Sequence, residues 1–272
     1  MPRRPFGLSV LLLLLGSALS FVPLQGQQSF KWPPGKRAAI SLSFDDARLS
    51  QIDHGLALLE KYGIKATFFV SPATVKERLP GWKKAVALGH EIGNHSMTHP
   101  CTANYEFSAQ NALEDYTLAR MAKQLDDANA EVERLLGVKP VTFAYPCGQK
   151  FVGRGLEVKS YVPLVAARFL VGRGYLDEAA TDPDRCDLAQ AMGVGFDALT
   201  SKQIMDLVAD AAKSGRWLIF VGHEIGKPAE QTTNIVALED LLKYAKDPAN
   251  GIWIDTVEAI GKYVQNQRSG AH

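Results

Sequence analysis

Three groups of residues in this 272-residue chain could carry out metal and acid–base chemistry. The adjacent carboxylates Asp45 and Asp46 end an apolar run, His95 and His99 stand four residues apart, and His223 directly follows a second apolar run. Two imidazoles and one carboxylate can hold Zn²⁺ and leave a position open for water. The second carboxylate and the distant histidine would then be free to accept and donate protons.

Each group also has an ordinary structural explanation. An Asp after a strand commonly caps a helix, and histidines occur widely outside binding sites. A cation-binding site of this kind lowers the pKa of a water bound there from 15.7 toward about 7, which gives the free carboxylate and the distant histidine defined roles. The chemical interpretation therefore depends on whether the fold brings the groups together.

Apolar runs alternate with amphipathic stretches along the chain. We predict strands at 38–44, 66–70, 90–93, 141–145, 169–171, 217–222 and 252–254, and helices at 52–62, 82–88, 110–136, 161–168, 202–213, 234–246 and 256–263. Continuously apolar strands are typical of parallel sheets covered by helices. Six or seven such units predict an α/β fold with an incomplete (β/α) barrel, whose carboxyl strand ends would carry the candidate residues.

The first 20 residues have the pattern of a secretory signal peptide: a basic start, the apolar stretch 8–15 and a small-residue exit. Residues 21–35 are predicted to be a linker, and no later apolar run is long enough to span a membrane. We therefore expect a secreted or periplasmic protein without an integral membrane segment after signal removal. The net charge of +1, without a basic block, gives no support to nucleic-acid binding.

The chain contains three cysteines, so at least one lacks a partner within the chain. Cys101 and Cys147 each follow a candidate site segment. If those segments are neighbours, a disulfide between the two is expected and Cys186 is left over.

The four segments 43–46, 95–99, 143–148 and 221–223, in this order, resemble the motifs of the polysaccharide deacetylases with a NodB homology domain, carbohydrate esterase family 4. Ser43-Phe44-Asp45-Asp46 is similar to the first motif, and His95-Ser96-Met97-Thr98-His99 to the second. The resemblance covers roughly residues 36–265, and we assign 36–268 to the catalytic domain. It implies a distorted, incomplete (β/α)₇ barrel.

The resemblance also implies a role for each residue. Asp45 would be the catalytic base and His223 the general acid, while one divalent metal would be held by Asp46, His95 and His99. Zinc is the expected metal, with cobalt, manganese and nickel as alternatives. The main-chain N–H of Cys147 would face the oxyanion, and Tyr145 would lie beside the substrate.

Two positions depart from the family pattern. The Arg that steadies the base in many members is replaced here by Ala144, and we expect Arg168 or Arg173 to reach in instead. The Asp that tunes the acid histidine has no evident counterpart. The candidates are Asp177, Asp182, Asp184 and Asp187.

The predicted function is therefore a secreted metal-dependent hydrolase that removes N-acetyl or O-acetyl groups from an acetylated polysaccharide or oligosaccharide. The alternatives are a hydrolase of a small non-peptide amide and a catalytically lapsed carbohydrate-binding protein. The sequence leaves the glycan open among chitin oligomers, peptidoglycan, poly-N-acetylglucosamine and acetylated xylan. Sugar-stacking candidates are Trp32, Trp82, Tyr105 and Trp217, although a Trp inside an apolar run is more often part of the core.

Overall fold

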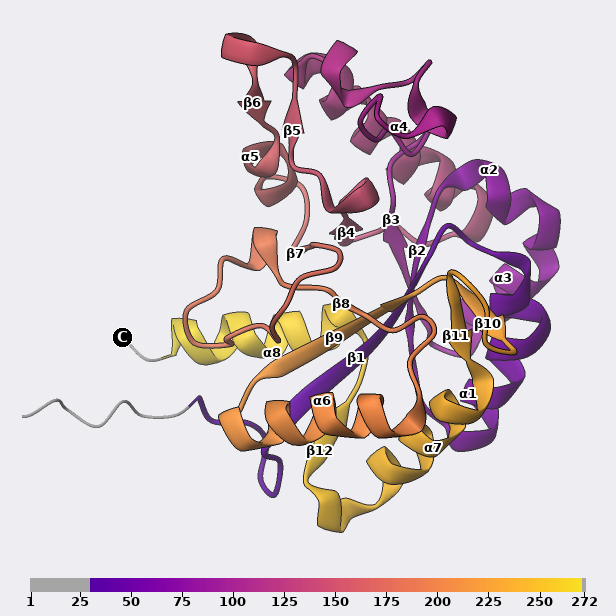
Figure 1. Ribbon diagram of the computed structural model, residues 1–272, viewed down its shortest axis with the longest axis vertical. Coiled ribbons are helices and arrows are strands. Elements are labelled where there is room, and N and C mark those ends of the chain that lie inside the picture. The colour runs from indigo at the N-terminus through magenta and orange to yellow at the C-terminus, as the bar shows by residue number, and fades with distance from the viewer. Residues whose placement is uncertain (1–29, 271–272) are drawn as a thin grey trace, which may run out of the picture.

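The computed structural model describes residues 30–270, in which an eight-stranded parallel sheet forms the centre of the molecule (Figure 1). Seven strands lie in the order β7-β4-β3-β2-β1-β9-β8, and β12 also pairs with β1. Their bounds are β1 (Ala38–Asp45), β2 (Thr67–Val70), β3 (Glu91–Asn94), β4 (Thr142–Ala144), β7 (Val171–Arg173), β8 (Val194–Gly195), β9 (Trp217–Gly222) and β12 (Ile252–Ile254).

Strand β1 lies at the centre of this sheet. It pairs with β9 along one side, while β12 and β2 share the other side, β12 beside its beginning and β2 beside its end. All these ladders are parallel, so the carboxyl ends of the strands face one rim. An isolated bridge between Arg173 and Ala191 brings the β7 edge to the segment that leads into β8. The sheet is thus a curled, incomplete barrel, as the sequence predicts.

Eight α-helices connect and cover the strands in the described part of the chain. They are α1 (Leu56–Tyr62), α2 (Pro72–Val75), α3 (Leu79–Ala87), α4 (Leu118–Leu136), α5 (Val162–Ala166), α6 (Ser201–Ser214), α7 (Ile235–Lys246) and α8 (Val257–Ser269). Two further strand pairs lie outside the main sheet: the antiparallel β5 (Phe151–Val152) and β6 (Lys159–Ser160), and the parallel β10 (Glu224–Gly226) and β11 (Thr232–Asn234). Figure 1 shows α6 and α7 side by side, below the crossing of β1 and β9.

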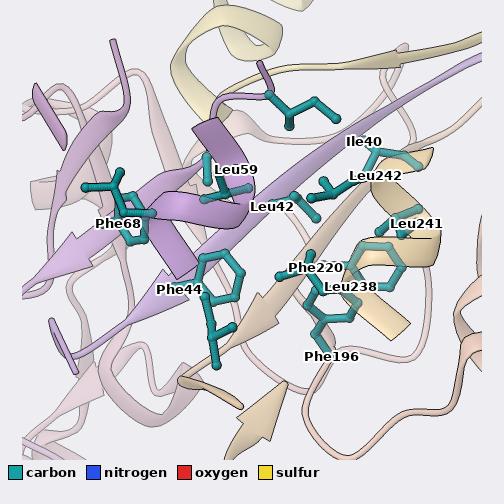
Figure 2. Close-up of a cluster of buried hydrophobic side chains, with 14 of the residues drawn as sticks. Ile40, Leu42, Phe44, Leu59, Phe68, Phe196, Phe220, Leu238, Leu241 and Leu242 are labelled. Atoms are coloured by element: carbon teal, nitrogen blue, oxygen red, sulfur yellow. The ribbon is translucent and has the colours of Figure 1, made fainter. Parts of the chain in front are cut away.

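The two faces of β1 have different surroundings, because side chains alternate along a strand. Ile40, Leu42 and Phe44 point outward into a core formed with β9 and α7 (Figure 2). The intervening Ser41 and Ser43 belong to the opposite face, and both are fully buried. Asp45 lies two residues after Ser43 and therefore belongs to the same face of the strand as these serines. The alternation that builds the core therefore turns Asp45 into the barrel at its rim.

Helix α8 packs at the amino ends of the strands. The backbone N–H groups of its first residues, Val257 and Glu258, donate to Thr67 Oγ1 at 2.9 Å and to Glu91 Oε2 at 2.8 Å. The buried Glu91 carboxylate also accepts hydrogen bonds from the hydroxyl groups of Thr67 and Thr142. The helix start thus ties together strands β2, β3 and β4 at the end opposite the candidate site.

Several sequence-based boundaries differ from the structure. The helix predicted to begin at 110 begins at Leu118, because the hydroxyl of Thr117 caps it by accepting the N–H of Arg120. Trp32, within the predicted linker, is already packed on the domain, with its ring stacked on Tyr263. The predicted signal peptide lies outside the described residues. Within residues 30–270, no helix has the length and apolar character needed to cross a membrane.

Candidate active site

A cleft of about 790 Å³ opens at the carboxyl ends of the strands. Most of the residues that the sequence singles out line it: Asp45, Asp46, His95, His99, Cys147 and His223. These come from segments that are up to 178 positions apart in the chain, and the parallel fold brings them together. The cleft is within the size range of small-ligand sites and is much larger than an acetyl group alone would need.

Asp46, His95 and His99 form a compact set of potential metal ligands. Their donor atoms lie within 4.8 Å of one another, and each imidazole Nε2 is 3.5 Å from Asp46 Oδ1. The other carboxylate oxygen of Asp46 accepts hydrogen bonds from Arg48, at 2.9 Å from Nη2. One oxygen of Asp46 is therefore directed to the two histidines while Arg48 fixes the other.

The backbone and its neighbours orient both imidazoles. His95 Nδ1 lies 2.9 Å from the carbonyl oxygen of Ala144, which as an acceptor places the ring proton on Nδ1 and leaves the Nε2 lone pair facing Asp46. The segment after β3 is a tight loop, in which Ser96 and His99 have positive φ angles of 63° and 49°. The His99 N–H donates to Ser96 Oγ at 3.0 Å, which holds this loop closed.

The electrostatics of the set suit a divalent cation. Burial, together with the neighbouring His95, lowers the pKa of His99 to about 4, so its imidazole is neutral at pH 7 and can donate a lone pair. Burial alone would raise the pKa of Asp46, but His95, His99 and Arg48 lower it by more in total. A set of two imidazoles and one carboxylate fits Zn²⁺ or a similar metal.

Asp45 is held by an arginine that comes from another strand. The fully buried guanidinium of Arg173, at the end of β7, donates through Nη2 to Asp45 Oδ1 and through Nη1 to the Gly174 carbonyl at 2.7 Å. The expectation that an arginine reaches in at this position is confirmed for Arg173. It is wrong for Arg168, which pairs with Asp126 on the surface of the domain.

His223 is paired with an aspartate that the sequence analysis did not propose. Its Nδ1 lies 2.6 Å from Asp197 Oδ2, and its backbone N–H donates to Asp197 Oδ1 at 3.1 Å. Thr233 also donates to Oδ1, so the carboxylate is fixed from three directions. The four predicted candidates, Asp177, Asp182, Asp184 and Asp187, do not make this contact. Asp197 follows the two-residue strand β8, and its position just after a strand end is the signal that could have identified it.

The pairing with Asp197 changes the pKa of His223. Burial alone would lower the pKa of the imidazole, but the hydrogen bond to Asp197 and the negative charges of Asp45, Asp197 and Asp46 raise it overall. A raised pKa favours the protonated form of the ring. The side chain is therefore prepared to donate a proton into the cleft.

A disulfide joins Cys101 to Cys147, which confirms the predicted pairing and leaves Cys186 free. It links the loop after His99 to the turn after β4, where Cys147 has a φ angle of 53° and lines the cleft. Tyr145 lies two residues earlier, and its ring is buried among apolar side chains while its hydroxyl donates to the Ala189 carbonyl at 2.8 Å. The structure thus places Cys147 at the cleft and the side chain of Tyr145 in the core.

Gln51 is a further residue of this site that sequence analysis did not reveal. Its buried side-chain amide donates to the carbonyl oxygens of Asp45 at 2.6 Å and His223 at 2.9 Å. One side chain thus links the ends of β1 and β9, which present the predicted base and acid.

The chain is similar to known polysaccharide deacetylases. Residues 33–157 match the family model of polysaccharide deacetylases. The chain is 28% identical over 233 residues to the peptidoglycan-N-acetylmuramic acid deacetylase PdaC of Bacillus subtilis, which covers 84% of this chain and 40% of that protein. It is 34% identical over 128 residues to the uncharacterized protein YlxY of the same species, covering 46% of this chain and 36% of that one. The chain thus spans less than half the length of both curated relatives.

Solved structures show the same fold. A Mycobacterium smegmatis protein assigned to the polysaccharide deacetylases superposes with a TM-score of 0.65 at 16% identity, covering 88% of this chain and 94% of that one. A family 4 acetyl xylan esterase from Clostridium thermocellum, solved in complex with a cobalt ion, gives a TM-score of 0.54 at 20% identity, covering 83% and 91%.

Proposed function

This chain belongs to the polysaccharide deacetylase family, and from that premise we propose that it is a metal-dependent enzyme that hydrolyses acetyl groups on an extracellular glycan. The observation that carries the proposal is the assembly in one cleft of three metal donors, an arginine-held carboxylate and an aspartate-paired histidine. A catalytically lapsed binding protein would have no need for all three.

Asp46, His95 and His99 would hold the metal. A divalent ion bound there supplies positive charge that polarises the acetyl carbonyl and acidifies a nearby water. Zinc is the proposed ion. Cobalt is an alternative that the acetyl xylan esterase supports, because that protein was solved with cobalt.

The remaining residues would handle protons and the developing negative charge. Asp45, kept in place by Arg173, accepts a proton from the attacking water. His223, protonated through its pairing with Asp197, donates a proton to the leaving nitrogen or oxygen. The main-chain N–H of Cys147 would stabilise the oxyanion, an effect worth about 3 to 4 kcal/mol where comparable donors have been removed.

The substrate and the location belong to the same proposal. The names of PdaC and of the acetyl xylan esterase indicate two candidate substrate types, an N-acetylated peptidoglycan sugar and an O-acetylated xylan. Export is proposed from the signal-like first 20 residues. The Cys101–Cys147 disulfide supports it, because such bonds persist mainly in oxidising compartments.

The experiment that tests the function is acetate release from a panel of acetylated polymers: chitin oligomers, peptidoglycan, poly-N-acetylglucosamine and acetylated xylan. The protein is stripped with a chelator and then supplied with Zn²⁺ or Co²⁺, beside an Asp45→Asn variant. We expect metal-dependent release from at least one polymer by the wild type and none by the variant, although the variant still binds the metal. Metal binding without release from any polymer would contradict the proposal.

A further inference from the structure

A second group of potential metal ligands adjoins the first. His99 Nδ1, Cys101 Sγ and Cys147 Sγ lie within 4.8 Å of one another, although the two sulfurs are joined as a disulfide in this structure. His99 belongs to both groups, because its Nε2 lies 3.5 Å from Asp46 Oδ1 and its Nδ1 lies 3.7 Å from Cys101 Sγ. The proposed reaction uses the Nε2 side and leaves the second group without a role.

The spacing of the second group fits a metal ion once the disulfide is reduced. Zinc binds an imidazole nitrogen at about 2.0–2.1 Å and a thiolate sulfur at about 2.3 Å, so in a tetrahedral site these two atoms lie about 3.6 Å apart. The 3.7 Å between His99 Nδ1 and Cys101 Sγ matches this separation. Two thiolates on such an ion lie about 3.8 Å apart. Because the Cα atoms of Cys101 and Cys147 are 6.0 Å apart, rotation of the two side chains reaches that distance without movement of the backbone.

Contacts other than the disulfide hold the two cysteine loops together. The Thr102 N–H donates to Gln149 Oε1 at 2.7 Å, which joins the residue after Cys101 to the turn that carries Cys147. The buried Ser108 hydroxyl accepts the Cys101 N–H at 2.8 Å and donates to the Cys101 carbonyl at 2.9 Å. Reduction therefore leaves the two thiols side by side on loops that are still fixed.

The His99 ring can serve only one of the two groups at a time, because a neutral imidazole has a single ring lone pair for a ligand. A metal at Asp46 needs the proton on Nδ1, and a metal at the cysteines needs it on Nε2. For His95 the Ala144 carbonyl, 2.9 Å from Nδ1, fixes the proton. Among residues 30–270, the one hydrogen-bond partner of His99 Nδ1 is Cys101 Sγ, and a sulfur is a weak acceptor. The proton of His99 is therefore not fixed in the same way.

We propose that Cys101, Cys147 and His99 form a redox-dependent second metal site that competes with the catalytic site for zinc or another thiophilic divalent ion. A dithiol reductant gives two electrons and two protons to the protein disulfide and is itself oxidised to a disulfide. Its thiolate attacks Cys147 Sγ, because Cys147 lines the cleft whereas Cys101 is fully buried. The metal ion then displaces the two thiol protons, and the thiolates, which zinc prefers as ligands, withdraw His99 from the catalytic group.

The disulfide thus keeps the second site closed and leaves His99 to the catalytic metal. Turnover then requires that the cysteines be oxidised, which agrees with the oxidising compartment proposed for this protein. This consequence for turnover rests on the proposed function, whereas the second site itself does not.

Cobalt absorption spectra test the second site directly, because thiolate ligands give Co²⁺ an intense near-ultraviolet charge-transfer band that nitrogen and oxygen ligands lack. Cys186→Ser protein, which has no cysteine outside the pair, is stripped with a chelator and divided into an oxidised and a dithiothreitol-reduced sample. Both are desalted under nitrogen and titrated with Co²⁺. We expect the band in the reduced sample only, one tightly bound ion per chain in both samples, and loss of the band on reoxidation. With His99→Ala added, the reduced protein should give the band with at least 10-fold weaker affinity.

The matched control is Cys101→Ser/Cys147→Ser in the same background, which lacks the cross-link but offers no thiolates. It should give no charge-transfer band. With one equivalent of Zn²⁺ it should release acetate at least 10-fold faster than the reduced protein that has both cysteines, because only the latter diverts the metal. Equal rates would show that loss of the cross-link alone lowers turnover and would overturn the competition. If the double variant does not fold, the oxidised and reduced spectra still decide whether the second site exists.

These outcomes separate the second site from the proposed function. A reduced protein without the charge-transfer band would overturn the second site, whatever its activity. A band without acetate release from any polymer by the oxidised protein would support the site while refuting the deacetylase assignment. Acetate release at the same rate before and after reduction would refute the competition and leave the deacetylase assignment in place.

Discussion

Replacement of Asp197 by Asn gives the sharpest test of how the pKa of His223, the proposed general acid, is raised. The carboxylate lies 2.6 Å from His223 Nδ1 and is itself fixed by the His223 N–H and by Thr233. Asn has the same shape and can still accept both of those hydrogen bonds, so the variant should keep its local geometry. It removes the negative charge, which helps to raise the pKa of His223.

The size of the effect follows from the bond that is lost. A hydrogen bond to a charged group contributes about 1.5–3 kcal/mol, which corresponds to a loss of about 10- to 100-fold in kcat/KM when the imidazolium is less populated. The loss should be largest near pH 8 and smaller near pH 5.5, because the imidazole is protonated at low pH even without Asp197. The alkaline limb of the pH profile should therefore move to lower pH.

The His223–Asp197 pair also makes the stability of the fold depend on pH. Because the pKa of His223 is higher in the folded protein than in the unfolded chain, the pair stabilises the fold fully below the unfolded value of about 6.5. That contribution is lost as the pH rises through the folded-state pKa. Asp197→Asn should accordingly destabilise the protein more at pH 6 than at pH 9.

The assay is kcat/KM for acetate release between pH 5 and 9, with Asp187→Asn as the matched control. Asp187 is one of the candidates that the sequence suggested, and its carboxylate caps a short turn by accepting the Ala189 N–H at 3.0 Å. The control should keep the wild-type profile. An Asp197→Asn profile that coincides with the wild type, or an Asp187→Asn profile that shifts instead, would refute this account of His223.

Three other substitutions test the supporting structure. Arg173→Met should abolish most turnover and lower the free energy of unfolding by about 3–5 kcal/mol, because it leaves a buried carboxylate unpaired. The control Arg168→Ala, which removes a surface ion pair, should lower the free energy of unfolding by only about 0–1 kcal/mol. Equal effects of the two substitutions in urea titrations would contradict this. The double substitution Cys101→Ser/Cys147→Ser should lower the unfolding free energy by about 2–4 kcal/mol, and an unchanged midpoint of thermal unfolding would contradict a structural role. Burial raises the pKa of Glu91 from 4.5 to about 7. The protonated side chain therefore stabilises the fold fully below pH 4.5, and this contribution to the free energy of unfolding should fall by about 3 kcal/mol as the pH rises through 7. Relative to the wild type, Glu91→Gln should therefore gain stability between pH 5 and pH 8, and a constant difference would exclude this role for Glu91.

The parallel barrel and most of the site could be predicted because both depend on local pattern. Continuous apolar runs mark buried parallel strands, and the residues just after them must share a rim. Asp45 and His223 follow such runs directly, His95 follows the less apolar predicted strand 90–93, and the structure places all three in the cleft. The disulfide was predictable for the same reason, since Cys101 and Cys147 follow two of these segments.

The parts that could not be predicted depend on register and on short elements. The partner of Asp45 was undecided between Arg168 and Arg173, because only the alignment of β7 with β4 shows which arginine reaches the barrel interior. Asp197 was missed because β8 has two residues, too few for a recognisable pattern. The Tyr145 side chain points into the core, a direction that depends on strand register rather than on its neighbourhood in the motif.

The most direct test of the central claim is a calorimetric titration of the chelator-stripped protein with Zn²⁺, in parallel with Asp46→Asn and Asp45→Asn. We predict one zinc ion per chain for the wild type, similar binding for Asp45→Asn, and loss of at least 10-fold in affinity for Asp46→Asn, because Asp46 belongs to the proposed ligand set with His95 and His99 and Asp45 does not. Absence of zinc binding by the wild type, or equal affinity in all three proteins, would contradict the account.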